Sequence, residues 1–216
     1  MPDLSFQIVE AEVPPFAAAP MLSFKVSIVN KIAQERISSI MLRSQIRLAV
    51  TRRRYSSDEQ IGLLELFGPP DRWADTLRSL LWMHTSTVVQ QFADNTIADL
   101  PAPCTYDFEI ASTKYFYALK DGDIPLDFLF SGTIFYENEE GQLQVAQIPW
   151  SKEAAFNMPV ALWQEMIARY YPNSTWLRLQ KNVFDQLYQY KVRQGLPTWE
   201  ETVLRLLHTS GEEVQP

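Results

Sequence analysis

The sequence predicts an α+β protein in which an antiparallel β-sandwich of the immunoglobulin-like type precedes a C-terminal helical appendage. Up to about Trp150 the hydrophobic residues mostly recur with a period of two, as Leu22, Phe24 and Val26 do. Such alternation is typical of half-buried strands in antiparallel sheets. After Trp150 the period becomes 3.6, which is typical of amphipathic helices. Strands followed by helices favour α+β over alternating α/β.

About seven strands are expected in the first part of the chain, separated by segments rich in proline, glycine, aspartate and asparagine. These turn-forming segments supply the backbone angles that reversals need. Two of them, 121–123 and 138–141, are predicted to be hairpin turns. The predicted strands cover residues 4–9, 22–28, 40–48, 80–89, 104–110 continuing toward 119, 125–136 and 143–148.

One short helix is predicted within this β-rich region. Ser57-Asp58-Glu59-Gln60 has the form of a capping box, in which a serine hydroxyl and a residue three positions later satisfy free amides at a helix start. The helix is expected at about 58–67. Residues 1–150 are therefore predicted to form a β-sandwich domain with one inserted helix.

Residues 151–216 are predicted to form a helical appendage packed on that domain. A first helical face runs from Leu162 to Tyr170, and a second helix starts near Leu179 and is closed by Gly195. A third helix is expected from Thr198, which opens another capping box.

The composition limits the cellular setting and the kinds of partner. The net charge of −7 opposes general nucleic-acid binding, because that binding depends on basic surfaces. No stretch approaches the roughly 20 apolar residues that span a membrane, and Asp3 stands where a signal peptide would carry basic residues. The lone Cys104 cannot form an internal disulfide. The sequence therefore predicts a cytoplasmic protein without membrane insertion.

Few residues of the usual catalytic types are present. The chain has two histidines and one cysteine, and His84, Cys104 and His208 lack the spacing of zinc ligands. Its seven glycines form neither a phosphate loop nor a dinucleotide fingerprint. Strand alternation puts His84 on the same face as Trp82 and Ser86, where we interpret it as structural or surface-exposed. We therefore expect no catalytic residue, no metal and no cofactor.

The most specific polar feature is a group of arginines. Arg43 and Arg47 alternate onto one face of a predicted strand, and Arg52, Arg53 and Arg54 follow at its end. Guanidinium groups bind carboxylates and phosphates in a fork and stack on aromatic rings. These five residues are the candidate interaction surface, although a solvated strand face that discourages edge pairing explains them as well.

The six tryptophans are expected to serve mainly as packing between the sandwich and the helices, because joining two layers needs large apolar side chains. They are Trp73, Trp82, Trp150, Trp163, Trp176 and Trp199.

Several strings together resemble an uncharacterised family of bacterial proteins, a domain of unknown function often encoded among the accessory genes of uptake nickel–iron hydrogenases. They are Leu4-Ser5-Phe6, Gln45-Ile46-Arg47, Arg52-Arg53-Arg54-Tyr55, Leu80-Leu81-Trp82-Met83-His84, Pro103-Cys104-Thr105-Tyr106-Asp107-Phe108-Glu109, Phe130-Ser131-Gly132-Thr133, Tyr171-Pro172-Asn173-Ser174 and Trp176-Leu177-Arg178-Leu179. The resemblance implies a role beside hydrogenase assembly or regulation. It assigns no catalytic residue.

The sequence is compatible with three hypotheses about function. The first is a non-catalytic cytoplasmic protein-interaction or accessory module with a protein partner, and self-association is left open. The second is a carboxylate-dependent enzyme or a carbohydrate-binding sandwich that uses Asp107, Glu109 and Asp127 with Tyr115 and Tyr117 as aromatic platforms. The third is a sensor that binds a phosphorylated or dicarboxylate ligand through the arginine group.

Overall fold

The computed structural model describes residues 2–32, 36–107, 110–175 and 177–210, and the chain divides into two compact units. The first unit is Met1–Thr175 and the second is Trp176–Pro216.

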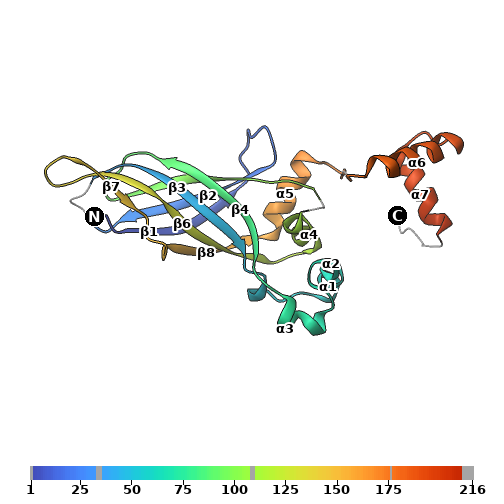
Figure 1. The fold of residues 1–216 in the computed structure, drawn as a ribbon, viewed down its shortest axis with the longest axis horizontal. Helices are drawn as coiled ribbons and strands as arrows, with labels where there is room; N and C mark the ends of the chain where they lie inside the picture. Colours follow the sequence, from blue (N-terminus) through green and yellow to red (C-terminus); the bar gives the residue numbers. More distant parts are fainter. Residues whose placement is uncertain (1, 33–35, 108–109, 176, 211–216) are drawn as a thin grey trace. The chain divides into compact units, whose positions relative to one another are not determined.

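The first unit is built on two antiparallel sheets (Figure 1). The three-stranded sheet has the order β1-β2-β5, with β1 at Leu4–Glu12, β2 at Met21–Asn30 and β5 at Asn95–Pro103. The five-stranded sheet has the order β4-β3-β6-β7, with β8 also paired to β6. Its strands are β3 (Arg36–Leu48), β4 (Leu80–Val89), β6 (Asp123–Glu137), β7 (Leu143–Gln147) and β8 (Glu153–Pro159).

The core lies between the buried faces of the two sheets. Ring contacts join them: Phe6 of β1 stacks on Phe130 of β6 with centroids 4.7 Å apart, and Phe24 of β2 meets Phe128 of β6 edge to face at 5.0 Å. These four side chains are buried. The alternation that predicted the strands therefore also predicted which face is apolar.

Strand β6 holds the larger sheet together. It pairs with β3 along nearly its whole length, while its other edge pairs with β8 over 123–129 and with β7 over 133–137. Gly132 lies at the change of partner, with φ +140°. A Cβ there would lie 2.0 Å from the Met41 carbonyl oxygen of β3. Only glycine therefore fits this position.

Short helices lie between the strands and after the last one. They are η1 (Val50–Arg52), α1 (Ser57–Gly62), α2 (Leu64–Phe67), η2 (Pro70–Arg72), α3 (Trp73–Thr76), α4 (Ala111–Ala118) and α5 (Val160–Tyr170). Figure 1 shows α4 and α5 at one end of the strands. Phe116 of α4 joins strand β4 to helix α5, because its ring centroid lies 5.0 Å from that of Trp82 on β4 and 5.4 Å from that of Trp163 on α5.

The second unit contains α6 (Lys181–Arg193) and α7 (Trp199–Thr209), which confirms the two helices predicted near its end. Thr198 caps α7 by accepting a hydrogen bond from the Glu201 amide at 3.1 Å, as predicted. Within the described ranges, none of the helices combines the length and the apolar character that crossing a membrane requires.

The strand predicted over 104–110 and onward to 119 is wrong. The strand is β5, which ends at Pro103, and α4 occupies Ala111–Ala118, while residues 108–109 lie outside the described part. Pro101 and Pro103 indicated a turn, yet β5 is an edge strand, where a missing N–H is tolerated. The hairpin turn predicted at 121–123 is therefore wrong, because this segment follows helix α4. The hairpin turn predicted at 138–141 is confirmed, because this segment joins β6 to β7.

The domain boundary lies later than predicted. The prediction placed it after residue 150, but β8 pairs with β6 and α5 belongs to the first unit, so the boundary follows Thr175. Residues 153–159 were missed because two alanines and an asparagine give a weak strand signal.

The inserted helix is confirmed in place but divided into α1 and α2. Its capping box starts one residue earlier than predicted, since Ser56 accepts from the Glu59 amide at 3.3 Å while Glu59 accepts from the Ser56 amide at 2.9 Å.

Replacing Gly132 tests the constraint on β6. We expect Gly132→Ala to lower the free energy of unfolding by about 3 kcal/mol or more, because both the positive φ and the contact with a backbone oxygen oppose a side chain. Gly141 is the control, since it has φ +75° and open space around it, so alanine there should cost about 1 kcal/mol. Urea unfolding measures both, and equal costs would contradict this account.

Candidate functional site

The predicted arginine group does not form one surface. Arg43 and Arg47 lie on the solvent face of β3, where both are exposed. Arg47 donates to the side-chain oxygen of Gln45 when that amide faces the guanidinium, at 2.8 Å from Nε. In the described part of the chain no ion pair involves Arg43.

Arg53 is buried and pairs with Glu59. Its Nη2 lies 2.6 Å from Glu59 Oε1, and the two side chains are only 8% and 3% exposed. The guanidinium also donates to the carbonyl oxygens of Asp121 and Asp123, each at 2.6 Å. Arg53 therefore joins the end of β3, helix α1 and the start of β6. Its assignment to an interaction surface was wrong, because its charge is paired with Glu59 inside the fold and both terminal nitrogens already donate to oxygens of the chain.

The surroundings of Glu59 lower its pKa. Burial by itself favours the neutral acid, but hydrogen bonds from the Lys120 and Ser56 amides and the Arg53 guanidinium outweigh it. The carboxylate is therefore the form that the folded protein requires.

The other two arginines differ from each other. Arg52 Nη2 lies 2.5 Å from Asp127 Oδ1 in a partly exposed pair, and Arg54 is exposed. Of the five predicted residues, only Arg43 and Arg54 are exposed without a partner among the described residues.

Where the structure describes them, the carboxylates predicted for an enzyme or carbohydrate-binding site are not brought together. Asp107 lies outside any strand and Glu109 lies outside the described residues, while Asp127 pairs with Arg52. Tyr115 is fully buried and cannot act as a platform, although Tyr117 is exposed. Among the residues that the structure describes, no three His, Cys, Asp or Glu side chains gather closely enough to hold a metal ion.

Cys104 follows the strand end of β5. Burial raises the pKa of its thiol to about 12, and the thiol donates to the Ala102 carbonyl oxygen at 3.3 Å. It therefore carries no thiolate at neutral pH and has the environment of a structural cysteine.

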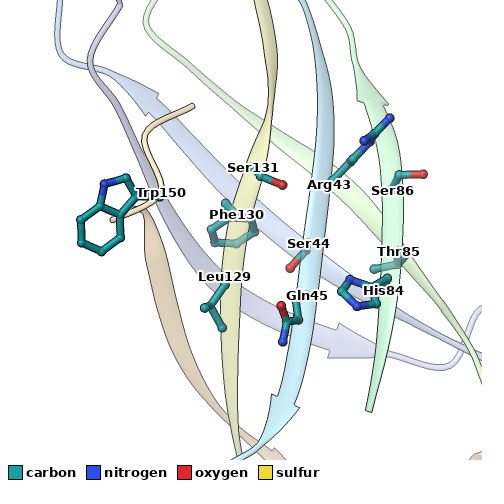
Figure 2. Close-up of a pocket in the computed structure, with 10 residues that line it drawn as sticks. All are labelled: Arg43, Ser44, Gln45, His84, Thr85, Ser86, Leu129, Phe130, Ser131 and Trp150. Atoms are coloured by element: carbon teal, nitrogen blue, oxygen red, sulfur yellow. The ribbon is translucent and has the colours of Figure 1, made fainter. Parts of the chain in front are cut away.

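A shallow groove of about 520 Å³ lies on the larger sheet (Figure 2). Two rows of side chains cross β4, β3 and β6: Ser86, Arg43 and Ser131 in one, and His84, Gln45 and Leu129 in the other. Strand spacing makes each row about 10 Å wide. We call it the sheet groove; its lining is Arg43, Ser44, Gln45, His84, Thr85, Ser86, Leu129, Phe130, Ser131 and Trp150.

Trp150 borders the sheet groove on the side of β6 away from β4 (Figure 2). It stands in a turn in which the Lys152 amide donates to the Pro149 carbonyl oxygen at 3.1 Å. Two more backbone bonds fix this turn to β6: Phe130 donates to Lys152 at 2.9 Å, and Ile148 donates to the oxygen of Gly132 at 2.9 Å. The indole is nevertheless 91% exposed.

Two predictions fail at this groove. Trp82 does not share a face with His84, because a bulge in β4 pairs Ile46 with Met83 and the next residue of β3 with Leu81. Trp82 therefore packs against Phe24 in the core, while His84 faces solvent. The packing role predicted for Trp150 is also wrong, since this residue is 91% exposed. The Pro-Trp pair between two strands was the signal for an exposed turn.

A second groove of about 510 Å³ lies between α4, α5 and the segment that ends the first unit. Its walls are aromatic: Tyr106 stacks on Tyr171 with centroids 5.6 Å apart and meets Trp163 at 5.9 Å. Lys120 is the charged residue in its lining.

The second unit lacks a core. Over 177–210, Thr202 is the one buried residue. Helix α6 contacts α7 through Trp199, whose centroid lies 5.3 Å from Phe184 and 6.3 Å from Tyr188. Ten large apolar side chains remain exposed over 177–210, eight on α6 and α7 and two, Leu177 and Leu179, in the segment before α6. We call these ten the helical apolar face: Leu177, Leu179, Val183, Phe184, Tyr188, Val192, Trp199, Val203, Leu204 and Leu206.

The fold and these surfaces define a class of protein: an α+β protein with two antiparallel sheets and an appended helix pair. The chain belongs to the family of unknown function DUF6084, whose model matches residues 1–215. No curated protein matches this sequence.

Two solved structures are distantly similar to this chain. The CARDB domain of the PF1109 protein from Pyrococcus furiosus is 11% identical, with a TM-score of 0.27, and the alignment covers 73% of this chain and 91% of that one. The putative ApaA protein from Bordetella pertussis is 14% identical with a TM-score of 0.27, covering 73% and 94%. These values support no conclusion about function.

The buried Arg53–Glu59 pair makes a stability prediction. We expect Glu59→Gln to lower the free energy of unfolding by about 3 kcal/mol, because it leaves the buried guanidinium without its counter-charge. Asp127→Asn, which breaks the partly exposed pair with Arg52, should cost less than about 1 kcal/mol. Denaturant unfolding at neutral pH compares the two.

The same pair predicts a pH dependence. The folded protein lowers the pKa of Glu59, so its contribution is complete above the ordinary value of 4.5 and is lost as the pH falls through the folded value. The stability difference between the parent protein and Glu59→Gln should therefore shrink as the pH falls below 4.5. A difference that stays constant through this range would contradict the assignment.

Proposed function

We propose that this protein is a non-catalytic docking module whose second unit binds a partner protein through the helical apolar face. One observation carries this proposal: α6 and α7 bury a single residue between them within 177–210. The first unit supplies a separately folded scaffold with its own core.

Burial of apolar surface is the main force that stabilises helices in water. Helices of 13 and 11 residues are marginal by themselves, since isolated helices need roughly 12–15 residues even in favourable sequences. Exposed apolar patches larger than a few hundred Å² mark interaction sites. The helical apolar face therefore needs a surface that covers it.

The partner is expected to offer an apolar groove. Amphipathic helices bind grooves through residues at i, i+4 and i+8, and Phe184, Tyr188 and Val192 have this spacing. All three are exposed.

Three finer parts of the proposal rest on the sequence and the topology. The two packed antiparallel sheets support an immunoglobulin-like β-sandwich. The single cysteine, which cannot form an internal disulfide, is typical of a reducing compartment and supports a cytoplasmic location. The resemblance to proteins encoded beside uptake nickel–iron hydrogenases supports a partner in the assembly or regulation of such an enzyme.

A charge placed on the helical apolar face tests this function. We expect Val192→Lys to reduce recovery of the partner at least about tenfold, because a buried ammonium opposes an apolar interface. Lysine in the last turn suits the helix dipole, so α6 itself is not weakened. The tagged full chain is purified from its native host at low salt, and mass spectrometry quantifies what co-elutes.

Val145→Lys on β7 is the matched control, since Val145 is 59% exposed and Val192 is 61% exposed. The proposal is supported by a stoichiometric partner that is lost with Val192→Lys and retained with Val145→Lys. It is overturned if both variants retain the same partner, or if light scattering shows that the chain covers this face by forming a homodimer.

A further inference from the structure

The sheet groove is independent of the helical apolar face, since all its residues belong to the first unit. It combines an uncovered aromatic ring at one side with polar side chains on a flat floor (Figure 2). Of its lining residues, only Arg43 belongs to the arginine group predicted as an interaction surface.

The turn that carries Trp150 is fixed, and the indole is not buried. One backbone hydrogen bond closes the turn and two hold it against β6, while the residue stays 91% exposed. A tryptophan offers 150–250 Å² of surface, which the fold leaves uncovered. Such a ring is available to stack on a flat apolar face of a ligand.

The floor of the groove favours an anion. Arg43 has no ion pair among the described residues, in contrast to Arg52 and Arg53, and no carboxylate lines the groove. An Arg guanidinium in such a site can bind a carboxylate through two parallel hydrogen bonds.

The remaining polar groups suit hydroxyl groups better than a peptide backbone. Gln45, His84, Ser86 and Ser131 offer both donors and acceptors. Both edges of β3 are paired, to β4 and to β6, and β6 is paired on its other side to β8 and β7. Of the three strands under the groove, β4 is the one at an edge of the sheet, so a peptide strand added to them would lie beside β4 at the rim of the groove and not across its floor. The net charge of −7 opposes a nucleic acid.

We propose that the sheet groove binds an acidic oligosaccharide, with a sugar ring stacked on Trp150 and a carboxylate held by Arg43. The ligand lies across the strands, because Trp150 and Arg43 stand on opposite sides of β6 (Figure 2). The hydroxyl groups between them meet Gln45 and Ser131. This binding goes beyond protein docking and uses none of the residues of the helical apolar face.

The test is a binding screen of the full chain on an array of uronate-containing oligosaccharides, each beside its methyl-esterified, uncharged form. Titration calorimetry then follows the strongest pair. We expect binding of acidic members, with at least about tenfold loss on esterification. No binding of any acidic oligosaccharide, or equal binding of the neutral forms, overturns the proposal.

Two pairs of variants locate the site. Trp150→Ala and Arg43→Gln should each weaken binding by about tenfold or more. Phe16→Ala and Arg54→Gln are their controls: Phe16 is 96% exposed outside the groove, and Arg54 is exposed outside it. Thermal unfolding verifies that every variant folds. Equal effects of the test and control variants overturn the assignment, whereas the fate of the protein partner does not bear on it.

Discussion

The change of partner along β6 is the constraint on which the first unit depends. One strand pairs with β3 on one side and with β8 and then β7 on the other, so a single backbone aligns three neighbours. This requires a conformation at Gly132 that brings the chain against the Met41 carbonyl oxygen. At the point where β6 changes its partner from β8 to β7, the segment that connects β7 to β8 carries the exposed Trp150. The same change of partner therefore shapes both the sheet and the groove on it.

The buried Arg53–Glu59 pair has a comparable role at the end of the sheets where the short helices lie. A buried ion pair contributes little net stability compared with apolar packing, but it costs much to break. Here it also orders the chain: Glu59 accepts from the amides of Ser56 and Lys120, and Arg53 donates to two carbonyl oxygens near the start of β6. Segments far apart in sequence are therefore held in one register.

Periodicity predicted most strands and all the longer C-terminal helices, because an element that buries one face has apolar residues at regular spacing in its sequence. It failed where tertiary context decides: α4 is rich in aromatic residues that favour strands, and its helix is stabilised by the burial of Tyr115 and Phe116. The site was harder to predict. A run of arginines does not show that Arg53 finds an internal counter-charge, and the exposure of Trp150 depends on β8, whose weak pattern gave no strand.

The two surfaces differ in how they are formed, and this bears on what each can do. The sheet groove is part of a hydrogen-bonded sheet with a packed core beneath it, so its side chains are in place before any ligand arrives and little ordering opposes binding. The helical apolar face has no core beneath it within 177–210, and under the proposed function α6 and α7 would gain most of their stability when a partner covers it. Binding and ordering are therefore coupled there, which lowers affinity per unit area but makes the complex easy to release. The two proposed sites, a rigid one for a small polar ligand and a conditional one for a protein, would suit an accessory protein that joins two different molecules.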